Sequence, residues 1–218
     1  DSGACRAQLV EMPGCYAVAN DVPSALAALE SRIASYYDWL RTHDEYTPIV
    51  AGPFYVRVKD TQHIAGRTPY VKEAFFPADA TPVSEEDLDW LLALLEWSLD
   101  DLLELGARIP PAERDMPTRT GSSPNVLLRQ AAEIQARYLT MLNAQPNPTA
   151  VALPDVPPLA QLREVKEVSL RRLRNTSDQD RARVVDVLGE RWSLRKILRC
   201  GILSARMHTE PLATTASQ

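Results

Sequence analysis

Leucines recur every three or four residues after Ser84, and this spacing constrains the fold more than any other feature of the sequence. They stand at Leu88, Leu91, Leu92, Leu95, Leu99, Leu102 and Leu103. The period matches one face of an α-helix, and an apolar stripe this wide must be buried against other apolar surfaces. The spacing therefore predicts a helix from about residue 84 that packs on further helices.

Three more helices are predicted in the same part of the chain. Ser123-Pro124 places a capping hydroxyl before a proline at the first helical position and opens a second helix. A third helix spans about Leu159–Arg174, and Trp192-Ser193 opens the last one. Val184–Leu188 fits a short strand as well as a helical turn. Residues 84–212 are therefore predicted to form an antiparallel four-helix bundle with long connections.

Residues 1–76 combine strand and helix patterns and predict a separate small domain. The patterns are a hairpin of Cys5–Glu11 and Cys15–Ala19 around Pro13-Gly14, a helix over Val22–Leu40, and an alternating strand over Phe54–Lys59. The predicted class is α+β: a small ferredoxin-like α+β domain, residues 1–76, followed by an all-α bundle, residues 84–212.

Charge and hydropathy exclude several kinds of partner. The net charge of -5 argues against nucleic acid or an anionic membrane surface as a partner. The longest strictly apolar run, Trp90–Leu95, is far shorter than the roughly 20 residues that span a bilayer. Charge is nevertheless uneven. Residues 159–218 hold 12 of the 24 Lys and Arg but 7 of the 29 Asp and Glu, a local net of +5.

The three cysteines, Cys5, Cys15 and Cys200, are too few and too scattered for a disulfide framework or a structural zinc site. Their odd number predicts free thiols and a cytoplasmic location. The chain begins at Asp1 without a methionine, so we expect residues upstream of it.

Two segments of the first domain resemble the HicB-type antitoxin fold. They are the hairpin Met12-Pro-Gly-Cys-Tyr, and the turn Asn20-Asp21-Val22-Pro23 followed by the helical stretch Ala25 through Leu40. Asn20-Asp21-Val22 stands where the family usually has Gly-Asp-Thr. The resemblance covers about 75 residues. The DNA-binding C-terminal module of that family is absent, so repressor activity is not implied.

The second domain resembles the DinB-like superfamily of four-helix bundles. The stretch Gly189-Glu-Arg-Trp-Ser-Leu-Arg-Lys-Ile-Leu198 and the later Ala205-Arg-Met-His208 carry this resemblance. The superfamily includes metal-dependent thiol transferases and maleylpyruvate isomerase-like proteins. Its active members place one histidine on the second helix and two, spaced i,i+4, on the last, and these ligands leave coordination positions open on a divalent ion.

Gln130, Ser204 and His208 stand at the three positions that the resemblance assigns to these histidines. A hydroxyl and a neutral amide are weak ligands for transition metals compared with imidazole. The resemblance therefore implies a degenerate site that binds no metal and needs no cofactor. All three side chains are expected to face inward and to leave a polar pocket between the helices.

These residues predict a binding or regulatory module that takes a small molecule or a protein. Two alternatives stay open. One is the thiol-transfer or isomerase chemistry of the DinB-like superfamily, with Glu133 or Glu210 as substitute donors. The other is a HicB-like antitoxin. Trp90, Leu94 and Trp97 lie outside the main leucine stripe and predict a homodimer.

Overall fold

The computed structural model describes residues 3–44, 47–49, 54–64, 72–118, 121–141 and 156–216. The chain divides into two compact units, Asp1–His63 and Ile64–Gln218. Both strands and helices are present, which confirms the predicted α+β class. No described helix is both long enough and apolar enough to cross a bilayer.

The first unit is a β-hairpin with one helix packed on it. Strands β1 (Cys5–Gln8) and β2 (Tyr16–Ala19) pair antiparallel, as predicted. Helix α1 (Val22–His43) contacts both strands. Asp21 caps this helix by accepting a hydrogen bond from the Ser24 N–H, which satisfies one of the free donors of the first turn.

Two further features of the first unit concern its turn and a strand that does not form. The Tyr36 hydroxyl of α1 donates a hydrogen bond of 2.8 Å to the carbonyl of Pro13 and ties the helix to the hairpin turn. The strand predicted over Phe54–Lys59 is wrong, because this segment has no strand conformation. Alternating apolar and polar residues indicate a strand with one buried face. A strand also needs a neighbouring strand to accept and donate its backbone hydrogen bonds.

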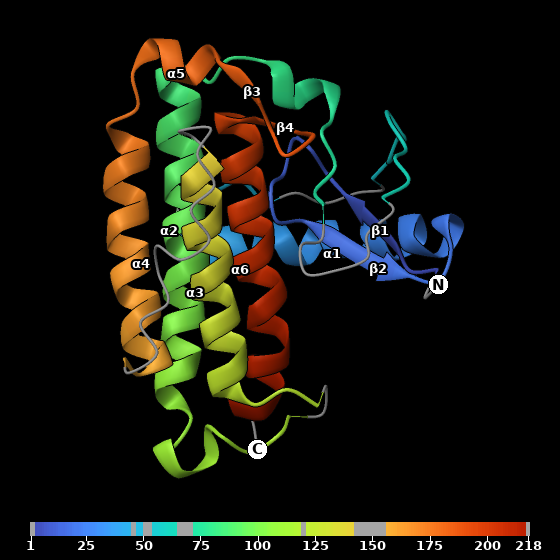
Figure 1. Cartoon of the computed structure of the whole chain (residues 1–218). Coiled ribbons are helices and arrows are strands. Elements are labelled where there is room, and N and C mark those ends of the chain that lie inside the picture. Colours follow the sequence, from blue (N-terminus) through green and yellow to red (C-terminus); the bar gives the residue numbers. More distant parts are fainter. Residues whose placement is uncertain are drawn as a thin grey trace. The chain divides into compact units, whose positions relative to one another are not determined.

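The second unit contains four long helices that pack side by side (Figure 1). They are α2 (Glu85–Arg108), α3 (Pro124–Met141), α4 (Pro158–Arg174) and α6 (Leu194–Ala216). Short 3₁₀ turns, η1 (Pro77–Ala80) and η2 (Pro111–Glu113), precede and follow α2. Between α4 and α6 lie the short helix α5 (Asp178–Ala182) and a hairpin of β3 (Val184–Val187) and β4 (Glu190–Ser193). The strand alternative for Val184–Leu188 is therefore the one that forms.

The bundle core is built from the predicted leucine stripe. Six of its seven leucines are at most 5% exposed, and Leu103 is half-buried. Full burial of one leucine contributes about 1.5–3 kcal/mol, so the stripe supplies a large share of the driving force for helix packing. Ser84 begins α2 by accepting a hydrogen bond from the Asp87 N–H.

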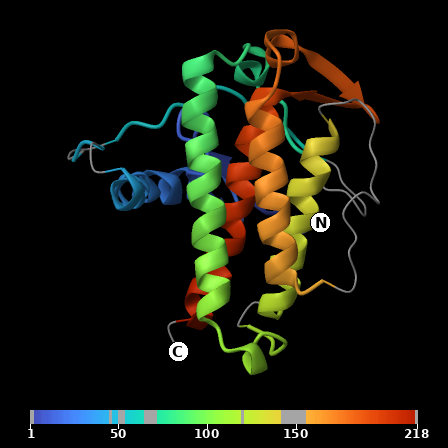
Figure 2. The same cartoon turned by 90° about the vertical axis from the view of Figure 1, so that its left-hand side faces the viewer.

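Two pairs of neighbouring helices are parallel, which differs from the antiparallel bundle expected from the sequence. Arg195 at the start of α6 pairs with Asp87 at the start of α2, so these two helices run in the same direction. Gly106 near the end of α2 lies against Leu128 and Leu159, near the starts of α3 and α4. Helices α3 and α4 therefore both run opposite to α2 (Figure 2). Helices α3 and α4 follow one another in the chain yet run in the same direction, whereas α4 ends at the end of the bundle at which α6 begins.

The boundary between the units falls between His63 and Ile64, whereas the sequence predicted a domain that ends at residue 76. Residues 73–80 belong to the second unit because they are hydrogen-bonded to α6 and the β3–β4 hairpin.

Leu94 is fully buried, so it is not part of the exposed apolar surface on which the expected homodimer rests. Trp90 is 40% exposed and meets Trp97 edge to face, with ring centres 5.8 Å apart.

Candidate functional site

The residues predicted to form a pocket do not all meet. Ser204 is 8% exposed and His208 is half-buried one turn later on α6, but Gln130 is exposed on α3. The expectation that Gln130 faces inward is wrong. The buried face of α3 includes Ala131, which follows it, and a step of one residue turns a helical side chain by about 100°.

Gln135 is the buried amide of α3, and it contacts α6. Its side-chain N–H donates a hydrogen bond of 2.7 Å to the carbonyl of Gly201, and the residue is 3% exposed. A Cβ at Gly201 would lie 3.0 Å from Gln135 Oε1, so any other residue at this position would crowd the Gln135 side chain. Since α3 and α6 are antiparallel, Ala131 and Ala132, one turn before Gln135, lie nearest the level of Ser204. The register of α3 could have been found from the apolar positions around Gln135.

Ser204 and His208 form a small polar spot on α6. The Ser204 Oγ is buried and has no hydrogen-bond partner. The His208 Nδ1 lies 2.7 Å from the carbonyl oxygen of Ser204. A carbonyl only accepts, so Nδ1 carries the proton and Nε2 is left as an acceptor. Burial lowers the pKa of His208, although the hydrogen bond to Ser204 opposes the shift, and the imidazole is neutral at pH 7.

The residues at this spot do not fit a divalent metal ion. His208 supplies one imidazole, Ser204 a hydroxyl, and the adjacent turn of α3 supplies alanines. Within the described ranges, no three His, Cys, Asp or Glu side chains lie close enough to hold a metal together. The donor set is therefore too weak for tight binding of a transition metal.

A buried ion pair that sequence reasoning missed lies near the start of α6. Arg199 donates to both carboxylate oxygens of Asp79, at 3.0 and 2.8 Å, and to the carbonyl of Ala74 at 2.8 Å. The Arg199 and Asp79 side chains are 3% and 0% exposed. Asp79 also accepts from the Phe76 N–H, so both oxygens of its carboxylate are used. A fork-shaped guanidinium bound in this way is geometrically specific.

Lys196 forms a second buried anchor one turn before Arg199. Its ammonium group donates to the Glu190 carboxylate at 2.7 Å and to the carbonyls of Glu73 and Arg191 at 2.7 and 2.9 Å. It also lies 4.0 Å from the ring centre of Trp192, in cation–π geometry. All three of its N–H donors are therefore satisfied. Together, Lys196 and Arg199 hold the segment 73–80 against α6.

Cys200 and Tyr138 lie beside these charges but are not available for chemistry. Burial raises the pKa of the Cys200 thiol to about 12, although Arg199 acts against the shift. Burial likewise raises the pKa of Tyr138, and electrostatic interaction with Cys200 adds to it. Both groups are therefore protonated at neutral pH. A reactive cysteine needs a stabilised thiolate and some exposure, and Cys200 is 1% exposed.

No protein-family model matches this chain, and no match was found among curated proteins or solved structures.

Proposed function

We propose that the chain is a binding and regulatory module whose second unit is a DinB-like bundle with a degenerate metal site. The observation that carries this proposal is the polar spot on α6. There, an unpartnered buried hydroxyl of Ser204 lies one turn from a neutral imidazole of His208. The spot offers one O–H donor and one ring-nitrogen acceptor, and these groups suit a small ligand that both donates and accepts hydrogen bonds.

The buried charges support a binding role over catalysis. A catalytic acid or base must reach the substrate with a free proton or lone pair. Arg199, Lys196 and Asp79 instead direct their donors and acceptors at one another and at backbone groups. Their arrangement makes a rigid bundle end, which suits a protein that presents surfaces to a partner.

Metal content and thiol chemistry test this proposal against the DinB-like enzymes. The full chain is purified without chelator and its zinc, nickel and manganese are measured by mass spectrometry. Turnover of low-molecular-weight thiols is then followed with and without each ion. We expect less than one ion per chain and a flat response. A full equivalent of one metal, or a rate that rises with added ion, contradicts the proposal.

A matched pair of serines tests the ligand spot itself. Ser98 is buried as Ser204 is, at 0% exposed against 8%, but its hydroxyl already donates to the carbonyl of Leu94. We expect Ser204→Ala to weaken binding of a small hydroxy or amide compound found by a thermal-shift screen, whereas Ser98→Ala leaves it unchanged. Equal effects of the two substitutions contradict a role for Ser204.

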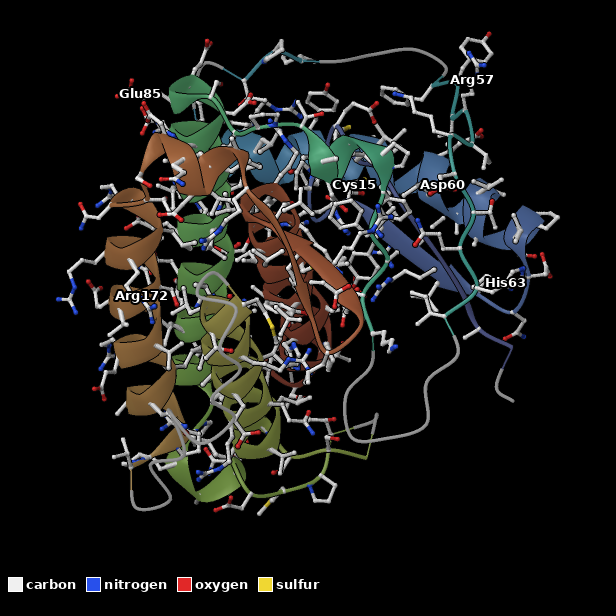
Figure 3. The ribbon with its side chains drawn as sticks, turned by 45° about the horizontal axis from the view of Figure 1, so that its top comes forward. Cys15, Arg57, Asp60, His63, Glu85 and Arg172 are labelled. Carbon is white, nitrogen blue, oxygen red and sulfur yellow. The ribbon has the colours of Figure 1, made fainter. Side chains whose placement is uncertain are left out.

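A second candidate function, general-base catalysis of thiol transfer or isomerisation, is favoured by His208 alone. Its Nε2 lone pair is available at neutral pH, as a general base requires. Loss of thiol turnover in His208→Gln, with full activity in an exposed-histidine control such as His63→Gln (labelled in Figure 3), supports this function. Absence of turnover in the wild type excludes it for the thiols assayed.

A further inference from the structure

The turn that joins β3 to β4 contains a leucine in an unfavourable backbone conformation. Leu188 and Gly189 have φ angles of 55° and 72°. Two consecutive positive angles are typical of a tight hairpin turn, for which Asn-Gly and Asp-Gly are preferred. A left-handed conformation brings the Cβ of a bulky residue too close to a carbonyl oxygen. Among the described residues, Leu188 alone combines a side chain with positive φ.

Leu188 is also 79% exposed to solvent. Its side chain therefore gains little from burial, and its backbone is strained in the isolated chain. Asparagine would relieve the strain and remove the apolar exposure at once. Backbone strain at a residue whose side chain does not stabilise the fold is a reason to look for a function of that residue.

Hydrogen bonds hold the backbone on the C-terminal side of Leu188 in place. The Asp186 carboxylate accepts a hydrogen bond of 2.9 Å from the Gly189 N–H and closes the turn. Directly after the turn, Glu190, which pairs with Val187, accepts from Lys196 of α6 and from the Glu73 N–H. Trp192, two residues after Glu190 on β4, is buried, with 2% of its surface exposed. The tip is therefore fixed to the bundle before any partner binds.

A positive charge, Arg191, follows Leu188 by three residues on the same hairpin. Arg191 is exposed, and its guanidinium carbon lies 4.4 Å from the ring centre of Phe75, which restricts its position. Asp186 is its cross-strand neighbour but bonds the turn instead. In the described part of the chain, no carboxylate lies within ion-pair distance of Arg191.

We propose that this tip is a docking surface for a partner protein that has an apolar pocket with a carboxylate at its rim. Leu188 fills the pocket and Arg191 pairs with the carboxylate. Because hydrogen bonds hold the backbone of the turn before binding, less conformational entropy is lost in the complex. A membrane surface is a poorer occupant, because stable anchoring takes more apolar area than one leucine and the chain carries a net charge of -5. The surface shares no residue with the Ser204 and His208 spot, so the two proposals can fail independently.

Thermal unfolding tests the strain. We expect Leu188→Asn in the full chain to raise the Tm by about 2–4 °C. Val126→Asn is the control. Val126 is 44% exposed on α3, and valine and asparagine have similar helix propensities, so its Tm is expected to stay unchanged. A fall in the Tm of Leu188→Asn shows that the leucine stabilises the fold and overturns the proposal.

Photo-crosslinking followed by titration tests the partner. p-Benzoylphenylalanine replaces Leu188, or Val126 as the control, and the full chain is irradiated in an extract of its source cells. The protein captured at position 188 is then purified and titrated with the wild type and with Leu188→Asn, Arg191→Gln and Val126→Asn. We expect an adduct at position 188 only, and a loss of affinity of about tenfold or more for Leu188→Asn. We expect a smaller loss, with weaker salt dependence, for Arg191→Gln, and none for Val126→Asn.

Three further results overturn the proposal. The first is no adduct at position 188, or an equal adduct at position 126. The second is a captured protein that binds Leu188→Asn as tightly as the wild type. The third is flotation of the wild type, but not of Leu188→Asn, with phosphatidylcholine–phosphatidylserine vesicles, which would assign the tip to a membrane.

Discussion

Breaking the buried pair of Asp79 and Arg199 should destabilise the second unit more than any exposed ion pair does. Asp79→Leu removes both carboxylate acceptors of the guanidinium and the acceptor of the Phe76 N–H. The Arg199 side chain is 3% exposed, so water does not replace these bonds. Removal of one partner from a buried pair costs about 3–5 kcal/mol. We expect this loss for Asp79→Leu and a similar one for Arg199→Met.

The double variant separates the ion pair from the packing around it. Asp79→Leu with Arg199→Met removes both charges and leaves the Phe76 N–H without its acceptor, which costs about 1–3 kcal/mol. The double variant should therefore be more stable than either single variant. The measurement is urea unfolding followed by tryptophan fluorescence, since three of the four tryptophans lie in the second unit.

An exposed pair on α2 is the matched control. Glu104 and Arg108 form an ion pair whose side chains are 61% and 62% exposed. Glu104→Leu should change the free energy of unfolding by about 1 kcal/mol or less. The reasoning is refuted if Asp79→Leu costs no more than Glu104→Leu, or if the double variant loses the sum of the two single losses.

Three further predictions concern single residues of the described chain. Native protein at pH 8 should react with a thiol reagent at the half-buried Cys5 and not at Cys200. Cys200 should react only after unfolding, because burial raises the pKa of its thiol to about 12. Fast labelling of Cys200 in the native protein would contradict this. His208 should make the protein less stable as the pH falls below about 6.5, since the unfolded state binds a proton there while the buried imidazole, whose pKa is lowered, stays neutral. A His208→Gln variant that shows the same pH dependence of unfolding as the wild type would exclude this role. Gly201→Ala should destabilise the bundle by about 1–2 kcal/mol in urea unfolding, because the new Cβ would lie 3.0 Å from Gln135 Oε1. An increase in stability from helix propensity alone would show that Gln135 moves aside without loss.

The buried positions of the bundle could be predicted from the sequence more accurately than the side chains of the site between its helices. The positions of Leu88 and Leu95 relative to Ser84 were enough to place α2 and its buried face. The inward residue of α3 was misplaced, because a resemblance pointed to Gln130 while the apolar positions of the helix put Gln135 inside. Gln130 directly precedes the buried Ala131, and one residue turns a helical side chain by about 100°, enough to move it from the core to the surface.

The sequence by itself determined the local elements, because these depend on neighbours along the chain. The Pro13-Gly14 turn, the Ser84 cap and the leucine period each act within a few residues. The tertiary structure alone decided which charges are buried together and which helices run parallel. Asp79 and Arg199 are 120 residues apart, and no local pattern marks them as partners. Their pairing follows from the path of the whole chain, because desolvated charges are stable only where the fold brings opposite charges within hydrogen-bond distance.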